Sequence, residues 1–143
     1  MQILKFTADE PACYSQEYDL RNLVLRHPLG LDLKDEDLSR DKTDIHLGVF
    51  DGEKLVASLI LHPMEDGIVQ MRQVCTHPDR QGEGLGKMLV EAAEQLAKEE
   101  GFRQMVLHGR QTAAGFYRKL GYQTDDVVFT ELGIPHISFS KLL

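Results

Sequence analysis

Three glycines alternate with other residues in the segment Gln81-Gly82-Glu83-Gly84-Leu85-Gly86-Lys87. The segment follows an apolar run that ends at His77-Pro78, and it lies where a helical pattern begins. Glycine has no Cβ atom, so several backbone N–H groups can converge on an anion. The start of a helix adds unpaired amides and the positive end of the helix dipole. The segment therefore predicts a phosphate-bearing ligand, although glycine-rich turns also begin helices that bind nothing.

Two common phosphate-binding motifs do not fit this segment. A P-loop requires Gly-Lys followed by Ser or Thr, whereas Lys87 is followed by Met88. A dinucleotide-binding fold places its glycines near the first strand. Here three predicted strands, joined at Asp51-Gly52 and Asp66-Gly67, precede the loop.

Hydrophobic periodicity predicts the elements that position the loop. Strands are expected at 2–7, 44–50, 54–62, 68–76, 102–107, 122–123, 127–130 and 137–139, and helices at 14–26, 85–100 and 113–120. A right-handed crossover through the second helix would set the strands on either side of it parallel. This order predicts one α+β (α/β) domain over residues 1–143: a mixed, mostly antiparallel sheet with a central βαβ unit and helices on both faces.

Composition narrows the class of partner. The formal charge of −7 argues against nonspecific binding of nucleic acid or of anionic membranes, and it is mildly compatible with cationic acceptors such as amines. No apolar stretch approaches the roughly 20 residues that span a bilayer, and Met1–Phe6 does not begin a secretion signal. Neither the cysteines nor the histidines show metal-ligand spacing. We therefore expect a cytoplasmic protein without a metal.

The glycine segment, on this order of elements, resembles the GNAT superfamily of acetyl-CoA-dependent N-acyltransferases. The family signature is Gln or Arg, two residues, Gly, one residue, and Gly or Ala, which Gln81–Gly86 satisfies. A second block, Ala113–Tyr122, is similar to the later family motif with its Phe-Tyr and Leu-Gly-aromatic pairs. Gly133–His136 resembles the ending of uncharacterised bacterial members. The resemblance covers nearly the whole chain.

This resemblance implies that acetyl-CoA is the acyl donor. Its pyrophosphate would bind the loop amides, and its pantetheine arm would pair with the strand before the loop, in a gap beside the strand at 102–107. The cofactor-binding residues that the resemblance implies are Val74, Cys75, Thr76, Gln81, Gly82, Glu83, Gly84, Leu85, Gly86, Lys87, Phe116 and Tyr117.

The resemblance also implies two catalytic groups. The N–H of Val74 would stabilise the oxyanion, and Tyr117 would protonate the departing thiolate. A phenol is a reasonable donor to a thiolate. The alternative for Tyr117 is a core aromatic residue whose hydroxyl is satisfied locally.

The general base is not provided where the family often has it. Many members carry a glutamate on the strand before the loop, whereas 69–73 contains no carboxylate. The proton would leave through water or through a group from elsewhere, and Glu131 and His136 are the candidates, because an imidazole can take up a proton near neutral pH. A solvated histidine in a connecting turn is an equal alternative for His136. His108 is expected to be a packed histidine, and Arg110, where the family often has Asn or Gln, could attract a phosphate or an acidic acceptor.

Together these features predict an N-acetyltransferase that acts by direct attack in a ternary complex. The acceptor would be a primary amine of a small molecule, peptide or protein, bound between the first helix and Pro28–Lys42. The alternative is a non-catalytic domain that binds CoA or acyl-CoA as a sensor or interaction module. Exposed sheet edges are compatible with a homodimer.

Overall fold

The computed structural model describes all 143 residues of the chain. Its main elements are β1 (Gln2–Phe6), α1 (Pro11–Arg21), β2 (Ile45–Asp51), β3 (Lys54–Pro63), β4 (Ile68–Thr76), α2 (Leu85–Glu99), β5 (Gln104–Arg110), α3 (Ala114–Lys119), β6 (Val128–Glu131) and β7 (Ile134–Leu142). Short 3-10 helices and one π-helical turn fill the connection between α1 and β2. None of the helices combines the length and the apolar character that a membrane span requires.

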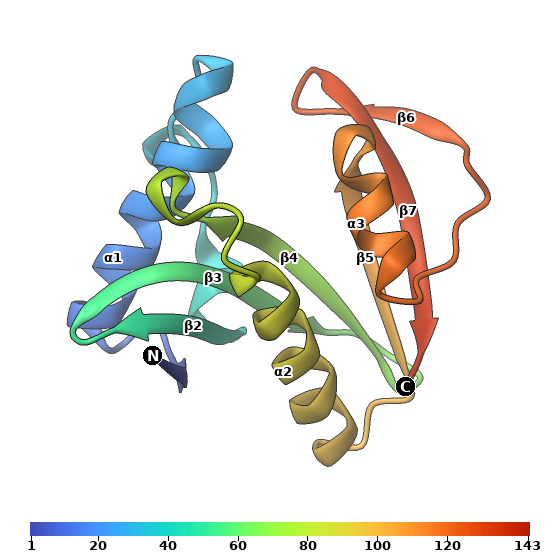
Figure 1. Cartoon of the computed structure of the whole chain (residues 1–143), viewed down its shortest axis with the longest axis horizontal. Coiled ribbons are helices and arrows are strands. Elements are labelled where there is room, and N and C mark those ends of the chain that lie inside the picture. The colour runs from blue at the N-terminus through green and yellow to red at the C-terminus, as the bar shows by residue number, and fades with distance from the viewer.

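The strands form one seven-stranded sheet in the order β1-β2-β3-β4-β5-β7-β6. Only β4 and β5 are parallel, because α2 carries the chain from the end of one strand to the start of the other (Figure 1). Every other neighbouring pair is antiparallel. The predicted mixed sheet with a central βαβ unit is confirmed.

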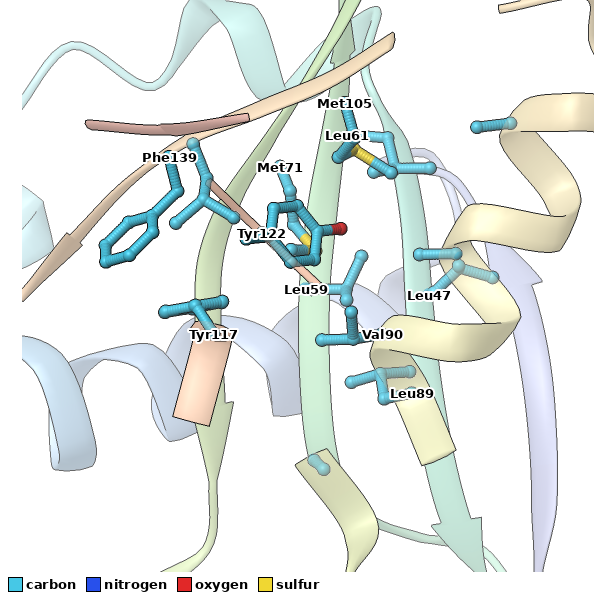
Figure 2. Packing of buried hydrophobic residues seen from close by; sticks show 14 of the residues in the cluster. Leu47, Leu59, Leu61, Met71, Leu89, Val90, Met105, Tyr117, Tyr122 and Phe139 are labelled. Carbon is cyan, nitrogen blue, oxygen red and sulfur yellow. The ribbon is translucent and has the colours of Figure 1, made fainter. Parts of the chain in front are cut away.

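Helices cover both faces of the sheet, as predicted. The larger apolar cluster joins α2 and α3 to one face, where Leu89 and Val90 pack against Leu47 and Leu59 (Figure 2). The smaller cluster lies on the face covered by α1. Alternation along β2 explains the division, since neighbouring residues of a strand point to opposite faces: His46 contacts Glu17 of α1, whereas Leu47 belongs to the α2 cluster.

Several predicted boundaries differ from the structure. The first helix begins at Pro11, which suits a first helical position, and it ends as an α-helix at Arg21 before a π-helical turn over Asn22–Arg26. The predicted strand at 122–123 is a single bridge from Gln123 to Ser140. β7 is longer than predicted, because Pro135 stands at the start of the strand, where a missing N–H is tolerated.

Candidate active site

β4 and β5 pair over only four positions and then separate. Their parallel register runs from Ile68 opposite Gln104 to Met71 opposite Leu107, and the remaining residues of the two strands have no partner across the gap (Figure 1). The separation opens a cavity of about 440 Å³. The gap that the family resemblance implied beside β4 is therefore present.

A β-bulge begins where the two strands part. Arg72 pairs with Ile60 of β3 and Cys75 pairs with Ser58, so that two residues, Gln73 and Val74, stand opposite one. Gln73 has φ of 56°, in the left-handed region that non-glycine residues rarely occupy. A bulge bends its strand and increases the local twist. This bend turns the end of β4 away from β5 and places Val74 in the cavity wall.

The glycine loop presents a run of unpaired amides at the start of α2. No backbone N–H from Gly82 to Lys87 donates to another backbone group, and the first helical bond runs from Met88 to the carbonyl of Gly84. Gly82 and Gly84 have φ of 81° and 77°, and a Cβ atom at either would meet nothing within 4 Å. The loop is therefore open, and its donors can bind an anion at the positive end of the helix dipole.

Side chains around the loop fix its position. The Gln81 side-chain amide donates to the Thr76 carbonyl at 3.0 Å, which ties the loop to the end of β4. A Cβ atom on Gly86 would lie 3.3 Å from the Phe116 ring, so this glycine permits α2 and α3 to approach. Leu85 is buried in the core, so it offers a ligand mainly its backbone.

The remaining expected cofactor contacts are backbone groups or surface side chains. The Cys75 side chain is buried on the α1 face, 3.6 Å from the Ser58 hydroxyl, and burial raises its pKa to about 11. Glu83 is held by Arg80, and Lys87 is exposed.

Tyr117 lies in the cavity wall with its ring packed in the core. Only 6% of the residue is exposed, and its ring centroid lies 5.1 Å from that of Phe116 and 5.4 Å from that of Phe139. Burial raises the pKa of Tyr117 to about 12, and no side-chain hydrogen bond offsets that effect. The phenol is therefore protonated throughout the neutral range, with a donor available to a group in the cavity.

Glu131 connects two histidines that line the same cavity. One carboxylate oxygen lies 3.1 Å from Nδ1 of His108, and the other lies 3.5 Å from Nε2 of His136. Nδ1 of His136 donates to the Ile134 carbonyl at 3.0 Å, which leaves Nε2 directed toward Glu131. All three side chains line the cavity. The structure thus brings the two candidate bases together, and adds a third group beside them.

The expectation that His108 is a packed histidine was wrong. Its side chain is 43% exposed, and its ring meets the edge of Phe129 at 5.0 Å between centroids. The alternation of β5 explains the error: the buried residues Met105, Leu107 and Gly109 face the core, so His108 faces outward into the cavity. No group of three or more His, Cys, Asp or Glu side chains has the arrangement of a metal site.

A buried polar network behind the bulge was not anticipated from the sequence. Arg21 of α1 is 1% exposed; its guanidinium donates to Asp41 at 2.7 Å and to the Gln73 side chain at 3.4 Å. Glu17 of the same helix bonds His46 at 2.8 Å. Charged residues spaced along a helix usually indicate a solvated face. The sequence therefore carried no signal that Glu17 and Arg21 are buried rather than solvated.

The chain matches known acetyltransferases over most of its length. The acetyltransferase (GNAT) family matches residues 7–122. The uncharacterised N-acetyltransferase YjcF of Bacillus subtilis (strain 168) is 31% identical over 97 residues, which cover 67% of this chain and 69% of YjcF. The uncharacterised protein YyaT of the same strain is 42% identical over 72 residues, which cover 50% of this chain and about half of YyaT (49%).

Solved structures agree with these matches. A crystal structure of a candidate N-acetyltransferase from Lactobacillus plantarum superimposes with a TM-score of 0.89 at 28% identity, over 99% of this chain and 97% of the other. The family match spans the glycine loop, the parting strands and Tyr117 together. On these grounds the chain belongs to the GNAT family of acetyltransferases.

Proposed function

We propose that this protein is an N-acetyltransferase that transfers the acetyl group of acetyl-CoA directly to a primary amine in a ternary complex. The observation that carries the proposal is the run of six unpaired amides, Gly82–Lys87, in the loop that follows β4 after β4 has parted from β5. The amides suit the pyrophosphate of CoA, and the free edge of β4 suits an extended pantetheine arm. The family supports acetyl-CoA as the donor.

The cavity residues can be given roles in the reaction. The amine nitrogen attacks the thioester carbonyl, a C–N bond forms, and the C–S bond then breaks. The Val74 N–H would stabilise the oxyanion that develops in between. The thiolate takes a proton from Tyr117 and leaves as CoA thiol, and the Tyr117 phenolate then takes up a proton from water. Burial that raises the pKa of the phenol would also disfavour the departing thiolate, because both anions lose hydration.

The attacking amine must lose a proton as it becomes an amide. We assign this step to the group formed by Glu131, His108 and His136, the cavity's one carboxylate and its two imidazoles. The Glu131 carboxylate orients both imidazole rings. It would also stabilise the positive charge on the ring that takes up the proton. A base in this position replaces the strand glutamate that β4 lacks.

The direct test is acetyl transfer over a panel of primary amines. Loss of thioester absorbance should be matched by an acetylated amine in the mass spectrum. Reagents that detect free thiols are less suitable, because Cys13 is partly exposed. If acetyl-CoA binds but no amine raises its consumption above hydrolysis, the protein is a CoA-binding domain without transferase activity.

Glu131→Gln tests the base assignment. We expect kcat to fall by about 10²-fold or more, with acetyl-CoA affinity unchanged. Glu53→Gln, in the exposed turn between β2 and β3, removes the same charge away from the cavity and should behave as the parent. If the two variants lower kcat equally, or if neither lowers it, Glu131 is not the base and the proton leaves through water.

A further inference from the structure

The cavity is far more positive than the molecule around it. The chain carries 23 acidic and 16 basic side chains. Yet only one carboxylate, that of Glu131, lines the cavity, together with four of the eight arginines of the chain: Arg26, Arg40, Arg72 and Arg110. Local charge rather than net charge decides which ligand a cleft attracts. The arginines are therefore the feature that bears on the acceptor.

Two of the four guanidinium groups are neutralised within the protein. Arg26 is buried and bonds Glu36 through two nitrogens, at 2.6 and 3.1 Å. Arg72 bonds Asp44 at 3.1 Å. These pairs form part of the wall and leave no unbalanced charge.

Arg40 and Arg110 have no such partner. Arg110 donates one hydrogen bond, to the Leu25 carbonyl at 3.1 Å, and Arg40 donates one, to the Gln70 side chain at 3.3 Å. A guanidinium has five N–H donors, so most of those on each side chain are unused. Burial, and then the like charge of Arg26, lower the pKa of Arg110, as expected for a guanidinium with no carboxylate beside it.

We propose that the acceptor amine carries a carboxylate or phosphate group, which Arg110 binds inside the cavity and Arg40 assists at its rim. This inference rests on the proposed function and names its acceptor class. A planar guanidinium fork matches such anions in geometry as well as charge. Arg110 is the second residue after His108, so the anion site and the assigned base lie along the same strand end.

The charge inside the cavity disfavours the cationic acceptors with which the net charge of the chain was compatible. An overall charge of −7 was mildly compatible with cationic acceptors, but a polycationic amine would meet two unpaired guanidinium groups in the cavity wall. The cavity volume of about 440 Å³ is that of a site for a small molecule. A small anionic amine fits both observations.

Matched acceptor pairs provide the test. Each ω-amino carboxylate is compared with its amide, and each aminoalkyl phosphate with the corresponding amino alcohol, on the full chain with saturating acetyl-CoA. In the pair with the larger ratio, we expect kcat/KM to be at least about tenfold higher for the anionic amine than for its neutral counterpart. The pair with the larger ratio distinguishes a carboxylate from a phosphate.

Arg110→Gln should remove that preference. Its kcat/KM for the anionic acceptor is expected to fall by about 10- to 100-fold, mainly through KM. Its kcat/KM for the neutral acceptor should stay within about twofold of the parent. Arg40→Gln should have a smaller effect of the same kind, and Arg110→Lys should restore part of the preference. Lys54→Gln, which removes one positive charge from the exposed first residue of β3, is the control.

Three results would overturn the inference. Neutral or dicationic amines could prove equal or better acceptors than anionic ones. Arg110→Gln could lower kcat/KM for both members of a pair equally. Arg110→Gln could weaken CoA binding and leave the acceptor preference intact, which would assign Arg110 to the cofactor.

A binding measurement separates this inference from the proposed function. Calorimetric titration of the anionic amine into the complex with CoA requires no turnover. Binding that Arg110→Gln abolishes, without any acetylation, would support the anion site and contradict the transferase. Acetylation of neutral amines only, with no binding of anionic ones, would support the transferase and contradict the anion site. Absence of both binding and acetylation would overturn both.

Discussion

The Tyr117 ring and the Tyr117 hydroxyl have separable roles. The ring packs between Phe116 and Phe139, whereas the hydroxyl has no side-chain partner. Tyr117→Phe keeps the ring and should lower kcat by about 10- to 100-fold, with acetyl-CoA affinity nearly unchanged. Because burial raises the pKa of Tyr117 to about 12, no loss of rate below about pH 11 should come from its ionisation. A Phe variant with the parental kcat would make Tyr117 a core residue only.

Gly84 tests the anion site of the loop. Gly84→Asp would place a carboxylate among the unpaired amides, and we expect CoA affinity to fall by at least about 100-fold, as measured by calorimetry. Gly52→Asp is a matched control, since Gly52 also has positive φ and a Cβ atom added there would meet nothing within 4 Å. The two variants should lose similar stability, about 1 kcal/mol, from the left-handed backbone. Retained CoA affinity in the Gly84→Asp variant would place the phosphates elsewhere.

At the level of elements, one carboxylate joins α2 to the end of the sheet. Glu94 accepts from the Tyr122 hydroxyl at 2.8 Å and pairs with Lys141 of β7 at 3.1 Å. Lys141 also donates to the Leu120 carbonyl. Glu94→Ala leaves a buried hydroxyl and an ammonium group without their partner, so the free energy of unfolding should fall by about 2–4 kcal/mol.

Denaturant unfolding of Glu94→Ala measures this loss. Glu91→Ala is the control on the same helix: Glu91 is exposed and lies 4.0 Å from Lys87, a pair that contributes about 0.5 kcal/mol or less. Equal stability of the two variants would mean that solvent replaces the contacts of Glu94 at no cost.

Elements whose signals are local were predictable from the sequence. The Asp-Gly turns, the alternation of the strands and the face of α2 each depend on neighbouring residues, and they predicted the order of the elements along the chain and the parallel crossover. The glycine loop was predictable for the same reason. The contact of Glu131 with His108 was not, because it depends on the register of β7 between β5 and β6. The bulge at Gln73 had no signal, since glutamine has no preference for positive φ.

Across the whole molecule, the buried network behind β4 links stability to pH. Nδ1 of His46 faces Glu17 at 2.8 Å, and Nε2 faces the Asp41 carbonyl at 2.7 Å, so both nitrogens donate when Glu17 is ionised. Burial alone would lower the pKa of His46, but the hydrogen bond and charge of Glu17 outweigh it and raise that pKa. Arg21 and Tyr14 also contact Asp41 in this network.

The sign of this effect follows from the raised pKa. The folded protein holds the His46 proton at pH values where the unfolded chain has released it. The stabilisation is therefore complete below about pH 6.5 and is lost as pH rises toward the folded pKa, at up to about 1.4 kcal/mol per pH unit. Denaturant unfolding between about pH 6 and 9 measures the slope. His46→Gln should be less stable and should lose most of the slope; a parental slope in the variant would assign the proton to another group.

The short pairing of β4 with β5 also has a mechanical consequence. The two halves of the sheet are joined through only four residue pairs, and five residues of β4 extend beyond the last of them. At about 3.3 Å per residue that overhang is about 16 Å long, so a rotation of about 5° at the junction moves its tip by about 1.4 Å. Val69 and Met105, both fully buried, form one of these pairs. Neither residue lines the cavity, so a change in the volume of their side chains would alter the angle between the strands without changing a group of the site.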